Sequence, residues 1–415
     1  MTIEQFHLSE VTVKHLKNVA YGHVVFQANT FDGYHHVVGI YGPNGSGKTT
    51  VLEALHLISE LWKGKALTQA TLDILPFDQP ATVAVVFQLN ETINVHYEVT
   101  IERTLDQPAF ATVLHEKLTT QAVHEVDATS QVVFDWQSSH LAEITQTNQE
   151  QLTSPFILNE DHSTLQAEWV HRLKDEIAPR IIYISKQAMD ESRIWLPDRQ
   201  QHSSDALNWI DYESQHVLSD EAIDQLNKRL IPLNQVLQAL LPDLAVVATS
   251  TEQNQLEIWA VRSDRRLLLT YESTGTKKII QLISALINVY HDEAAIVLID
   301  ELDSGIYEYL LGELLEVMQR GARGQLIFTS HNLRPLEILE PHQIYFATFT
   351  QSNRYVQPTF DQEETNLRDA YLRLLQVDQV QQKGHQINPF TIQRALRTAK
   401  RWLSTMDERG ESHEE

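Results

Sequence analysis

The residues with the clearest chemical potential form a glycine-rich loop, GPNGSGKT, at residues 42–49. The spacing matches the pattern G-x-x-x-x-G-K-[ST], in which backbone N–H groups surround a phosphate. In such a loop Lys48 would reach the β- and γ-phosphates of a nucleotide, and the Thr49 hydroxyl would ligate Mg²⁺. The residues expected to contact the nucleotide are Asn44, Gly45, Ser46, Gly47, Lys48, Thr49 and Thr50.

A nucleotide site of this type also needs an acidic group at the end of a buried strand, and AAIVLIDE at 294–301 supplies one. Asp300 would hold the Mg²⁺ shell. Glu301 would accept a proton from the attacking water or orient that water. The alternative is an ordinary strand that ends in a charged turn, and the phosphate loop in the same chain disfavours it.

A histidine follows the next apolar strand, because QLIFTS at 325–330 leads directly into His331. At this place the side chain can contact the γ-phosphate and the attacking water. The alternative is a surface histidine, one of 19 in the chain. About 250 residues separate Lys48 from Asp300, a wide spacing that suits an ATPase whose two halves are divided by an inserted lobe.

Two further elements have open interpretations. In the segment 271–286, Ser273 and Gly275 precede an amphipathic helix, whose N-terminus could bind an anion or could carry a simple cap. Gln88 follows a strand and is a candidate for the glutamine that contacts the nucleotide in some ATPases. It could equally be a residue of a lobe strand.

Strands and helices alternate around the loop, which predicts an α/β fold. Residues 120–180 have only a weak pattern of apolar residues. The helical stretch at 203–242 lacks sustained heptads, so a long coiled coil is not expected. The expected strands lie at 8–41, 81–118, 181–184, 255–271, 295–300 and 325–329. The expected helices lie at 49–62, 203–242, 276–290, 306–319, 362–376 and 390–404.

Composition excludes several classes of function. The 415 residues include no cysteine, so there is no disulfide framework, Cys-type zinc site or thiol nucleophile. The net charge of −24 argues against a protein that coats nucleic acid with its whole surface, but it does not exclude a local basic groove. Basic residues gather at Lys277, Lys278, Arg320, Arg323, Arg394, Arg397, Lys400 and Arg401.

The sequence also bears on location. The N-terminus lacks the pattern of a signal peptide, and no stretch approaches 18 consecutive apolar residues. The expected location is therefore the cytoplasm, with no membrane partner.

Together these motifs resemble the ABC-type ATPase heads of the SMC, DNA-repair and OLD groups. The likeness is greatest to the compact prokaryotic AAA-type ATPases of abortive infection and phage defence. It covers about residues 1–115 and 255–375. The motifs that carry it are GPNGSGKT, ESTGT in place of the ABC signature, LIDELDSGI, TSH and NLRDAYL.

The resemblance implies a P-loop NTPase of the ABC-type head class, with a mixed sheet, flanking helices, a β lobe and an inserted helical subdomain. ATP and Mg²⁺ are the implied cofactors. The implied domains are 1–118 and 251–350 as the two parts of the head, 119–250 as a largely helical insertion, and 351–415 as a helical tail.

In such heads two subunits pair head to tail around two ATP molecules. The resemblance then implies that Ser273 and Gly275 of one subunit meet the γ-phosphate held by Lys48 of the other, with Asp303 at the seam. The signature departs from the usual Leu-Ser-Gly-Gly order, since Glu272 and Thr274 occupy two of its positions. This departure bears on how strongly ATP would drive pairing.

Three functions follow as hypotheses. The first is an ATP-driven switch that controls a separate effector, a nuclease or toxin encoded nearby, in phage defence. No nuclease is expected in this chain itself, because the 84 residues after His331 show no convincing nuclease motif. The second is a DNA-repair or chromosome-associated ATPase that binds DNA directly, which predicts long heptad arms. The third is a transporter subunit, which predicts a regular signature and a shorter chain.

Overall fold

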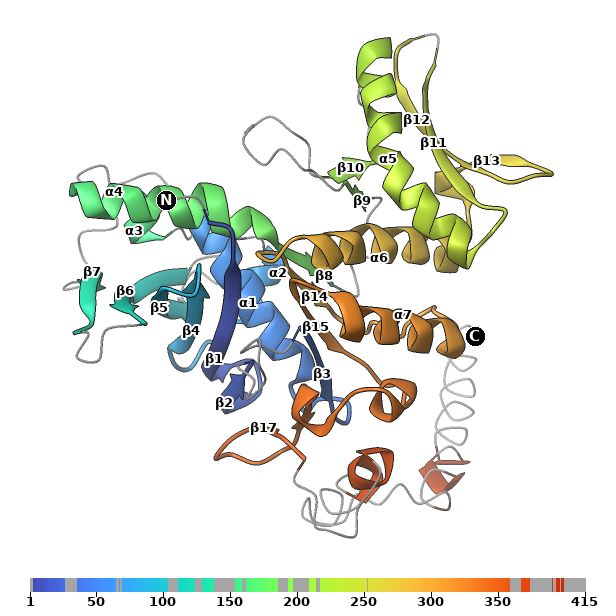
Figure 1. Cartoon of the computed structure of the whole chain (residues 1–415). Helices are drawn as coiled ribbons and strands as arrows, with labels where there is room; N and C mark the ends of the chain where they lie inside the picture. The colour runs from blue at the N-terminus through green and yellow to red at the C-terminus, as the bar shows by residue number, and fades with distance from the viewer. Residues whose placement is uncertain are drawn as a thin grey trace, which may run out of the picture. The chain divides into compact units, whose positions relative to one another are not determined.

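The glycine-rich loop at residues 42–49, from here on called the phosphate loop, follows strand β3 of a six-stranded sheet in the computed structural model (Figure 1). The strand order of this sheet is β17-β16-β3-β15-β14-β8. The strands β3, β8, β14, β15 and β16 are parallel, and only β17 runs antiparallel. Continuous apolar runs such as Ile296–Ile299 form these strands, because both faces of the sheet are covered. The bounds are β3 (Val37–Tyr41), β8 (Ile181–Ile184), β14 (Ile296–Ile299), β15 (Gln325–Thr329), β16 (Ile344–Ala347) and β17 (Tyr355–Val356).

A second six-stranded sheet, the lobe sheet, is antiparallel throughout, with the order β2-β1-β4-β5-β6-β7. Burial alternates along β4, as expected for a strand with one face on the core. The bounds are β1 (Phe6–Leu16), β2 (Val19–Val25), β4 (Ala81–Leu89), β5 (Ile93–Arg103), β6 (Ala111–Ala122) and β7 (Gln131–Gln137).

The structure describes most of the chain. The described residues are 3–26, 36–64, 67, 69–103, 111–123, 129–137, 154–158, 162–185, 193–196, 209–213, 217–251, 253–358, 367–373, 390, 393–395 and 397–398. The helices are α1 (Lys48–Trp62), α2 (Gln69–Leu72), α3 (Pro155–Leu158), α4 (Thr164–His171), α5 (Asp220–Leu240), α6 (Thr274–His291) and α7 (Glu308–Gly321).

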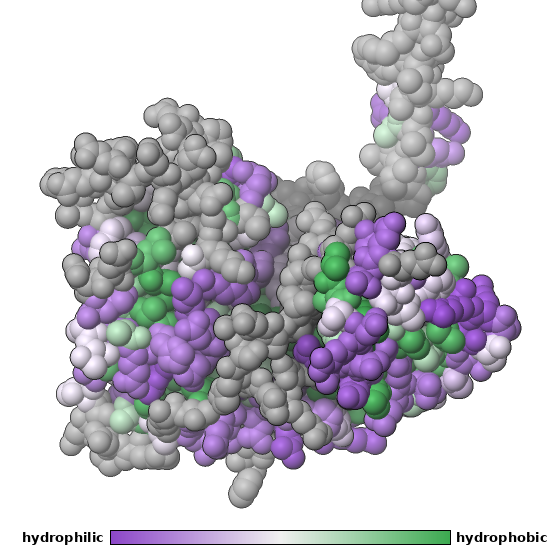
Figure 2. Space-filling model, turned by 90° about the horizontal axis from the view of Figure 1, so that it is seen from above, coloured by the Kyte–Doolittle hydropathy of each residue, from purple (hydrophilic) through white to green (hydrophobic). Residues whose placement is uncertain are grey.

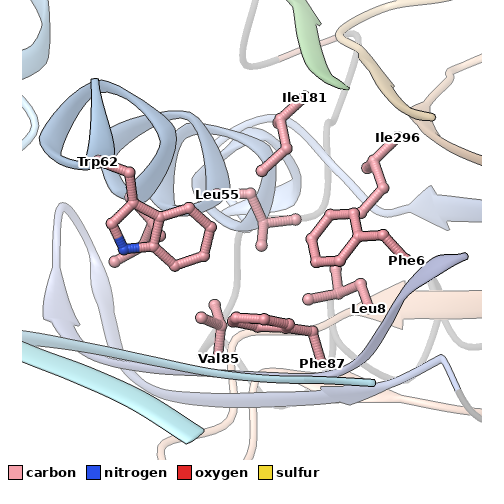
Figure 3. A pocket seen from close by; sticks show the side chains of 9 residues that line it. Phe6, Leu8, Leu55, Trp62, Val85, Phe87, Ile181 and Ile296 are labelled. Carbon is pink, nitrogen blue, oxygen red and sulfur yellow. The ribbon is translucent and has the colours of Figure 1, made fainter. Parts of the chain in front are cut away.

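Helix α1 packs against strands of both sheets and so joins them into one core. Figure 3 shows the apolar side chains that meet there. The Trp62 ring lies edge-on to Phe87, 5.5 Å between centroids, and Phe87 lies edge-on to Phe6 at 5.2 Å. The small pocket between them is lined by Phe6, Leu8, Leu55, Ile58, Trp62, Val85, Phe87, Ile181 and Ile296. Its wholly apolar lining makes it part of the core, which holds α1 and the loop before it in place.

A buried glutamine also ties the two sheets together. The Gln325 side chain, fully buried in β15, accepts a hydrogen bond from Leu8 N at 2.7 Å and donates one to Leu8 O at 3.0 Å. The ladder between β1 and β4 is irregular between Leu8 and Glu10. Gln325 therefore satisfies backbone groups that this bulge leaves inside the core.

We expect Gln325→Leu to lower the free energy of unfolding by about 3 kcal/mol, because two buried backbone groups lose their partners. Urea unfolding measures this loss. Gln69→Leu on an exposed helix position is the matched control and is expected to change stability by less than about 0.5 kcal/mol. An equal effect of both substitutions would contradict the role assigned to Gln325.

A second core lies in the middle of the chain, where α5 packs on the sheet β11-β12-β13. Asn227 and Asn234, two helical turns apart, each exchange two hydrogen bonds with the backbone of β11, at Ala248 and Val246. They cover the free edge of this sheet. The bounds are β9 (Arg193–Trp195), β10 (Trp209–Asp211), β11 (Ala245–Ser250), β12 (Leu256–Val261) and β13 (Arg266–Leu268).

The middle of the chain differs from the sequence-based expectation. Within the range 119–250, β7 joins the lobe sheet and β8 joins the sheet of the phosphate loop. Of the helix expected at 203–242, residues 220–240 are helical and 209–211 form a strand paired with β9, whereas 203–208 and 214–216 lie outside the described residues. The apolar pattern is ambiguous here, because Ile210 packs into the second core from a strand rather than from a helical face. The described stretch therefore mixes strands with helices.

The chain divides into two compact units, residues 1–367 and 368–415. The helix expected at 362–376 is helical at 367–373, and the rest of that range lies outside the described residues. Residues 393–395 and 397–398 are helical, whereas Lys400 and Arg401 lie outside the described residues.

Figure 2 shows hydrophobic residues in small groups among hydrophilic ones on the described surface. No helix in the described ranges is long and apolar enough to span a membrane.

Candidate nucleotide site

The phosphate loop connects the end of β3 to the first turn of α1. Gly45 and Gly47 have φ values of +78° and +93°, in the left-handed region that glycine favours. A Cβ on Gly47 would also lie 2.6 Å from the Val19 side chain. The glycines are therefore needed for a loop that directs backbone N–H groups toward an anion at the start of α1.

Lys48 is the first residue of α1, and its side chain turns back over the loop. The ammonium donates hydrogen bonds to the carbonyls of Gly42 at 2.8 Å and Pro43 at 3.1 Å. Burial lowers the pKa of Lys48, and the nearby carboxylates, Asp300 foremost, oppose that shift. The result is a positive charge held at the mouth of the loop, where a phosphate would be attracted.

Asp300, at the end of β14, lies beside Thr49. The Thr49 hydroxyl donates to Asp300 Oδ1 at 2.9 Å, and the Thr329 hydroxyl donates to the same oxygen at 2.6 Å. A hydroxyl and a carboxylate side by side are oxygen ligands of the kind that Mg²⁺ prefers. Thr329 was not singled out from the sequence, because a threonine at a strand end has no signal of its own.

Glu301 has an unusual backbone conformation, with φ of +49°. Its N–H donates to the Thr329 hydroxyl at 2.8 Å, and its carbonyl accepts from Lys278 Nζ at 3.1 Å. A non-glycine residue in this region costs about 1 kcal/mol or more, and such strain gathers at functional sites. Both backbone groups of Glu301 are thus fixed, which sets the direction of its side chain.

His331 follows β15 and reaches the same cleft. Its N–H donates to Asp303 Oδ1 at 3.2 Å, which links the turn after β15 to the turn after β14.

The structure brings most of the expected site residues together around one cleft. The cleft is lined by Lys17, Asn18, Asn44, Gly45, Gly47, Lys48, Thr49, Thr50, Asp300, Glu301 and His331. Ser46, the remaining loop residue of the expected set, is fully buried instead.

Lys17 and Asn18 were missed by sequence reasoning. They form the turn between β1 and β2, and the Asn18 side chain donates to the Gly45 carbonyl. Lys17 pairs with Glu53 of α1 at 2.8 Å. A Lys-Asn pair between two alternating strands signals a turn, but nothing local reveals that this turn lies against a loop 27 residues away.

Ser273 and Gly275 do not line the cleft that holds Lys48. Ser273 caps α6, because its hydroxyl accepts a hydrogen bond from Thr276 N at 3.1 Å. Gly275 lies beside the turn after β14, where an added Cβ would be 3.4 Å from the Gly305 carbonyl. Within one chain, the described structure supports the capping interpretation.

Glu272, one of the departures from the usual signature, has a structural partner. Its side chain is almost fully buried and forms an ion pair with Arg262. Burial raises the pKa of Glu272, but the hydrogen bond and the charge of Arg262 outweigh this and bring the pKa below its usual value. Glu272 therefore anchors the segment that leads into α6.

Gln88 lies in β4 of the lobe sheet, and its side-chain amide donates to Asn94 Oδ1 at 3.1 Å. The strand beside β14 at the cleft is β8, and Asp300 N donates to Ile184 O at 2.9 Å. The lobe-strand interpretation of Gln88 is therefore correct.

Four of the eight basic residues considered for a nucleic-acid groove engage oxygen atoms of the chain itself. The contacts are Lys277 Nζ with Thr270 O at 3.2 Å, Lys278 Nζ with Glu301 O at 3.1 Å, Arg320 with Glu316 at 3.0 Å, and Arg323 with Glu293 at 3.7 Å. Carboxylates therefore balance the charges of Arg320 and Arg323, whereas Lys277 and Lys278 donate to neutral backbone carbonyls.

Comparison with solved structures gave SMC heads among the matches. An SMC head domain from Thermotoga maritima has a TM-score of 0.41 and 15% identity over 85% of this chain and 100% of that chain. An Smc head bound to the C-terminal winged-helix domain of ScpA has a TM-score of 0.47 and 12% identity over 85% and 98%. An Smc head with an extended coiled coil, bound to the C-terminal domain of ScpA derived from Pyrococcus furiosus, has a TM-score of 0.48 and 12% identity over 90% and 100%.

A search of curated proteins gave no match. A protein-family model described as "AAA domain, putative AbiEii toxin, Type IV TA system" matches residues 37–337. This range holds the phosphate loop, the acidic pair after β14 and the histidine after β15. Because the match covers well over half of this chain, the chain belongs to this family of AAA-domain ATPases.

Proposed function

We propose that the protein binds ATP with Mg²⁺, hydrolyses it, and uses this cycle as a conformational switch. The observation that carries the proposal is the direct hydrogen bond between Thr49 and Asp300, 251 residues apart in the sequence. It joins the phosphate loop to a strand-end carboxylate in one polar cleft. Phosphate release from ATP, measured with and without Mg²⁺, tests the proposal, and no release under either condition would contradict it.

Each residue around the cleft has a proposed role. Lys48 and the backbone of residues 44–50 hold the phosphates, and Thr49 with Asp300 would hold Mg²⁺, which neutralises charge on the phosphates when bound. Glu301 takes a proton from the attacking water, and His331 contacts the γ-phosphate and that water. The fixed backbone of Glu301 supports this assignment, because a general base must be held in a defined position.

We further propose that two copies pair head to tail around ATP. Ser273 and Gly275 of one copy would then meet the phosphates held by Lys48 of the other. Two strongly exposed tyrosines support such a surface, since Tyr271 is 74% exposed and Tyr307 is 76% exposed. They flank the α6 N-terminus and the turn that lies against it, and tyrosine is enriched at protein interfaces.

Pairing predicts that two inactive variants complement each other. Lys48→Ala and Ser273→Ala each damage a different half of the composite site, so a mixed pair retains one intact site of two. With random pairing of equal amounts we expect about one quarter of the wild-type ATP turnover. Mixing Lys48→Ala with Glu301→Gln is the control and restores nothing, because both changes lie in the same half. Turnover no higher than this control would contradict the head-to-tail arrangement.

The output of the switch is proposed to be control of a separate effector, a nuclease or toxin encoded nearby, in phage defence. The family description, which names a putative AbiEii toxin and a Type IV system, supports this context. The open reading frame next to the gene tests it. A toxin whose effect on cells changes with Lys48→Ala would support the proposal, and a membrane permease there would contradict it.

The two parts of the ATPase head are proposed to be residues 1–118 and 251–350, with 119–250 inserted between them and 351–415 as the tail. The described strands refine this assignment. Because β8 pairs with β14 and β17 pairs with β16, we propose that residues 181–184 and 355–356 are parts of the head rather than of the insertion and the tail.

A further inference from the structure

Tyr355 lies in β17, far from the phosphate loop in sequence but in contact with it. Its hydroxyl donates a hydrogen bond to the Gly47 carbonyl at 2.7 Å across 308 residues. The side chain is 1% exposed. A phenol has an ordinary pKa of about 10 and is therefore protonated at neutral pH. Burial raises the pKa of Tyr355 further, so its hydroxyl can act as a donor.

The surroundings of Tyr355 are shaped to hold its ring. Gly22 of β2 lies directly against it, and a Cβ on Gly22 would be 2.4 Å from Tyr355 Cε2. The neighbouring residue supports the same loop by a second route. Arg354 donates to the backbone carbonyl of Asn18, and the Asn18 side chain donates to the Gly45 carbonyl. Two glycine carbonyls of the loop are thus connected to one C-terminal hairpin.

The hydrogen bond to Gly47 has a consequence for the next peptide N–H. A trans peptide is planar, so the Gly47 carbonyl and the Lys48 N–H point in opposite directions. The Gly47 carbonyl also accepts a hydrogen bond from Thr50 N at 3.1 Å, so Tyr355 adds a second, shorter bond that holds this carbonyl and keeps the Lys48 N–H pointing away from it. This N–H is the first of α1, and the N–H groups at the start of a helix form its anion-binding end.

We infer that Tyr355 is a positioning residue of the nucleotide site, which orients the Gly47–Lys48 peptide for phosphate binding before the nucleotide arrives. The inference rests on the proposed function, because it assigns how that same site is preorganised. Tyr355 acts through the loop and touches no part of the nucleotide.

Tyr355→Phe removes only the hydroxyl, and Tyr345→Phe is its matched control. Tyr345, in the same hairpin and 4% exposed, donates to the Val25 carbonyl at 2.7 Å, away from the loop. The Tyr345 hydroxyl also accepts a hydrogen bond from Val25 N at 3.1 Å, so the temperature of thermal unfolding should fall at least as far in Tyr345→Phe as in Tyr355→Phe. We expect the Kd for Mg²⁺–ADP, which occupies the loop without being hydrolysed, to rise about five-fold only in Tyr355→Phe.

Hydrogen exchange without nucleotide gives a second readout. Amides of residues 42–50 should exchange faster in Tyr355→Phe than in the wild type or in Tyr345→Phe. Gly22→Ala is a second variant, because its methyl group displaces the ring while the hydroxyl is retained, and it should weaken Mg²⁺–ADP binding likewise.

The outcomes separate the two proposals. If the wild type binds Mg²⁺–ADP and Tyr355→Phe binds it as tightly as Tyr345→Phe, with equal exchange of the loop, the positioning role is overturned and the nucleotide site stands. If the wild type binds neither ATP nor ADP, the nucleotide site itself is overturned.

Discussion

Glu301→Gln is expected to bind ATP with wild-type affinity, to lose at least about 100-fold in turnover, and to accumulate as an ATP-bound pair of subunits. The amide has the same shape as the carboxylate but cannot accept a proton from water, and a lost general base typically costs 10²- to 10⁴-fold. Placement of the residue should survive, because Thr329 and Lys278 hold the backbone of Glu301 rather than its side chain.

Two measurements check this expectation, phosphate release and gel filtration with ATP present. Glu316→Gln is the matched control, because Glu316 is a carboxylate of α7 paired with Arg320 on the surface. It should leave turnover and elution unchanged. Wild-type turnover in Glu301→Gln would remove Glu301 from the catalytic role. A variant that stays monomeric with ATP would count against the paired arrangement.

The local part of this site could be predicted from the sequence because its signals are local. The glycine spacing of residues 42–49 and the apolar period of the following helix are both readable within about 20 residues. The acids after β14 were predictable because an apolar run ends directly in Asp300 and Glu301. The structure adds that Asp300 meets Thr49 by a hydrogen bond, and the roles of these residues remain predictions.

The long-range part could not be predicted, because it depends on contacts that leave no local pattern. Asn18 supports the loop through a turn between two strands, and Tyr355 reaches it from the last strand of the sheet. Thr329 connects Asp300 and Glu301 as an ordinary strand residue. For Gln88 a local pattern was present but did not identify the location, because a strand with alternating apolar residues has the same pattern beside a site and in the lobe sheet.

Lys48→Ala is the second large effect, and we expect it to weaken ATP binding about 100-fold, which corresponds to about 2.7 kcal/mol. A charge-assisted hydrogen bond to phosphate in a partly buried cleft is stronger than an exposed one. Burial disfavours the charged form of Lys48, as its lowered pKa indicates. A bound phosphate would stabilise that charged form and so offset the free-energy cost of desolvating the ammonium.

Lys63→Ala is the matched control for this change. Lys63 follows the last turn of the same helix, at the end away from the phosphate loop, and forms a partly buried ion pair with Glu60, so its removal should leave ATP affinity unchanged. Titration calorimetry with ATP and Mg²⁺ measures both variants, and thermal unfolding verifies that each is folded. Since Lys48 also bonds Gly42 and Pro43, a modest loss of stability is expected. A folded Lys48→Ala protein that binds ATP like the Lys63→Ala variant would show that the phosphates lie elsewhere.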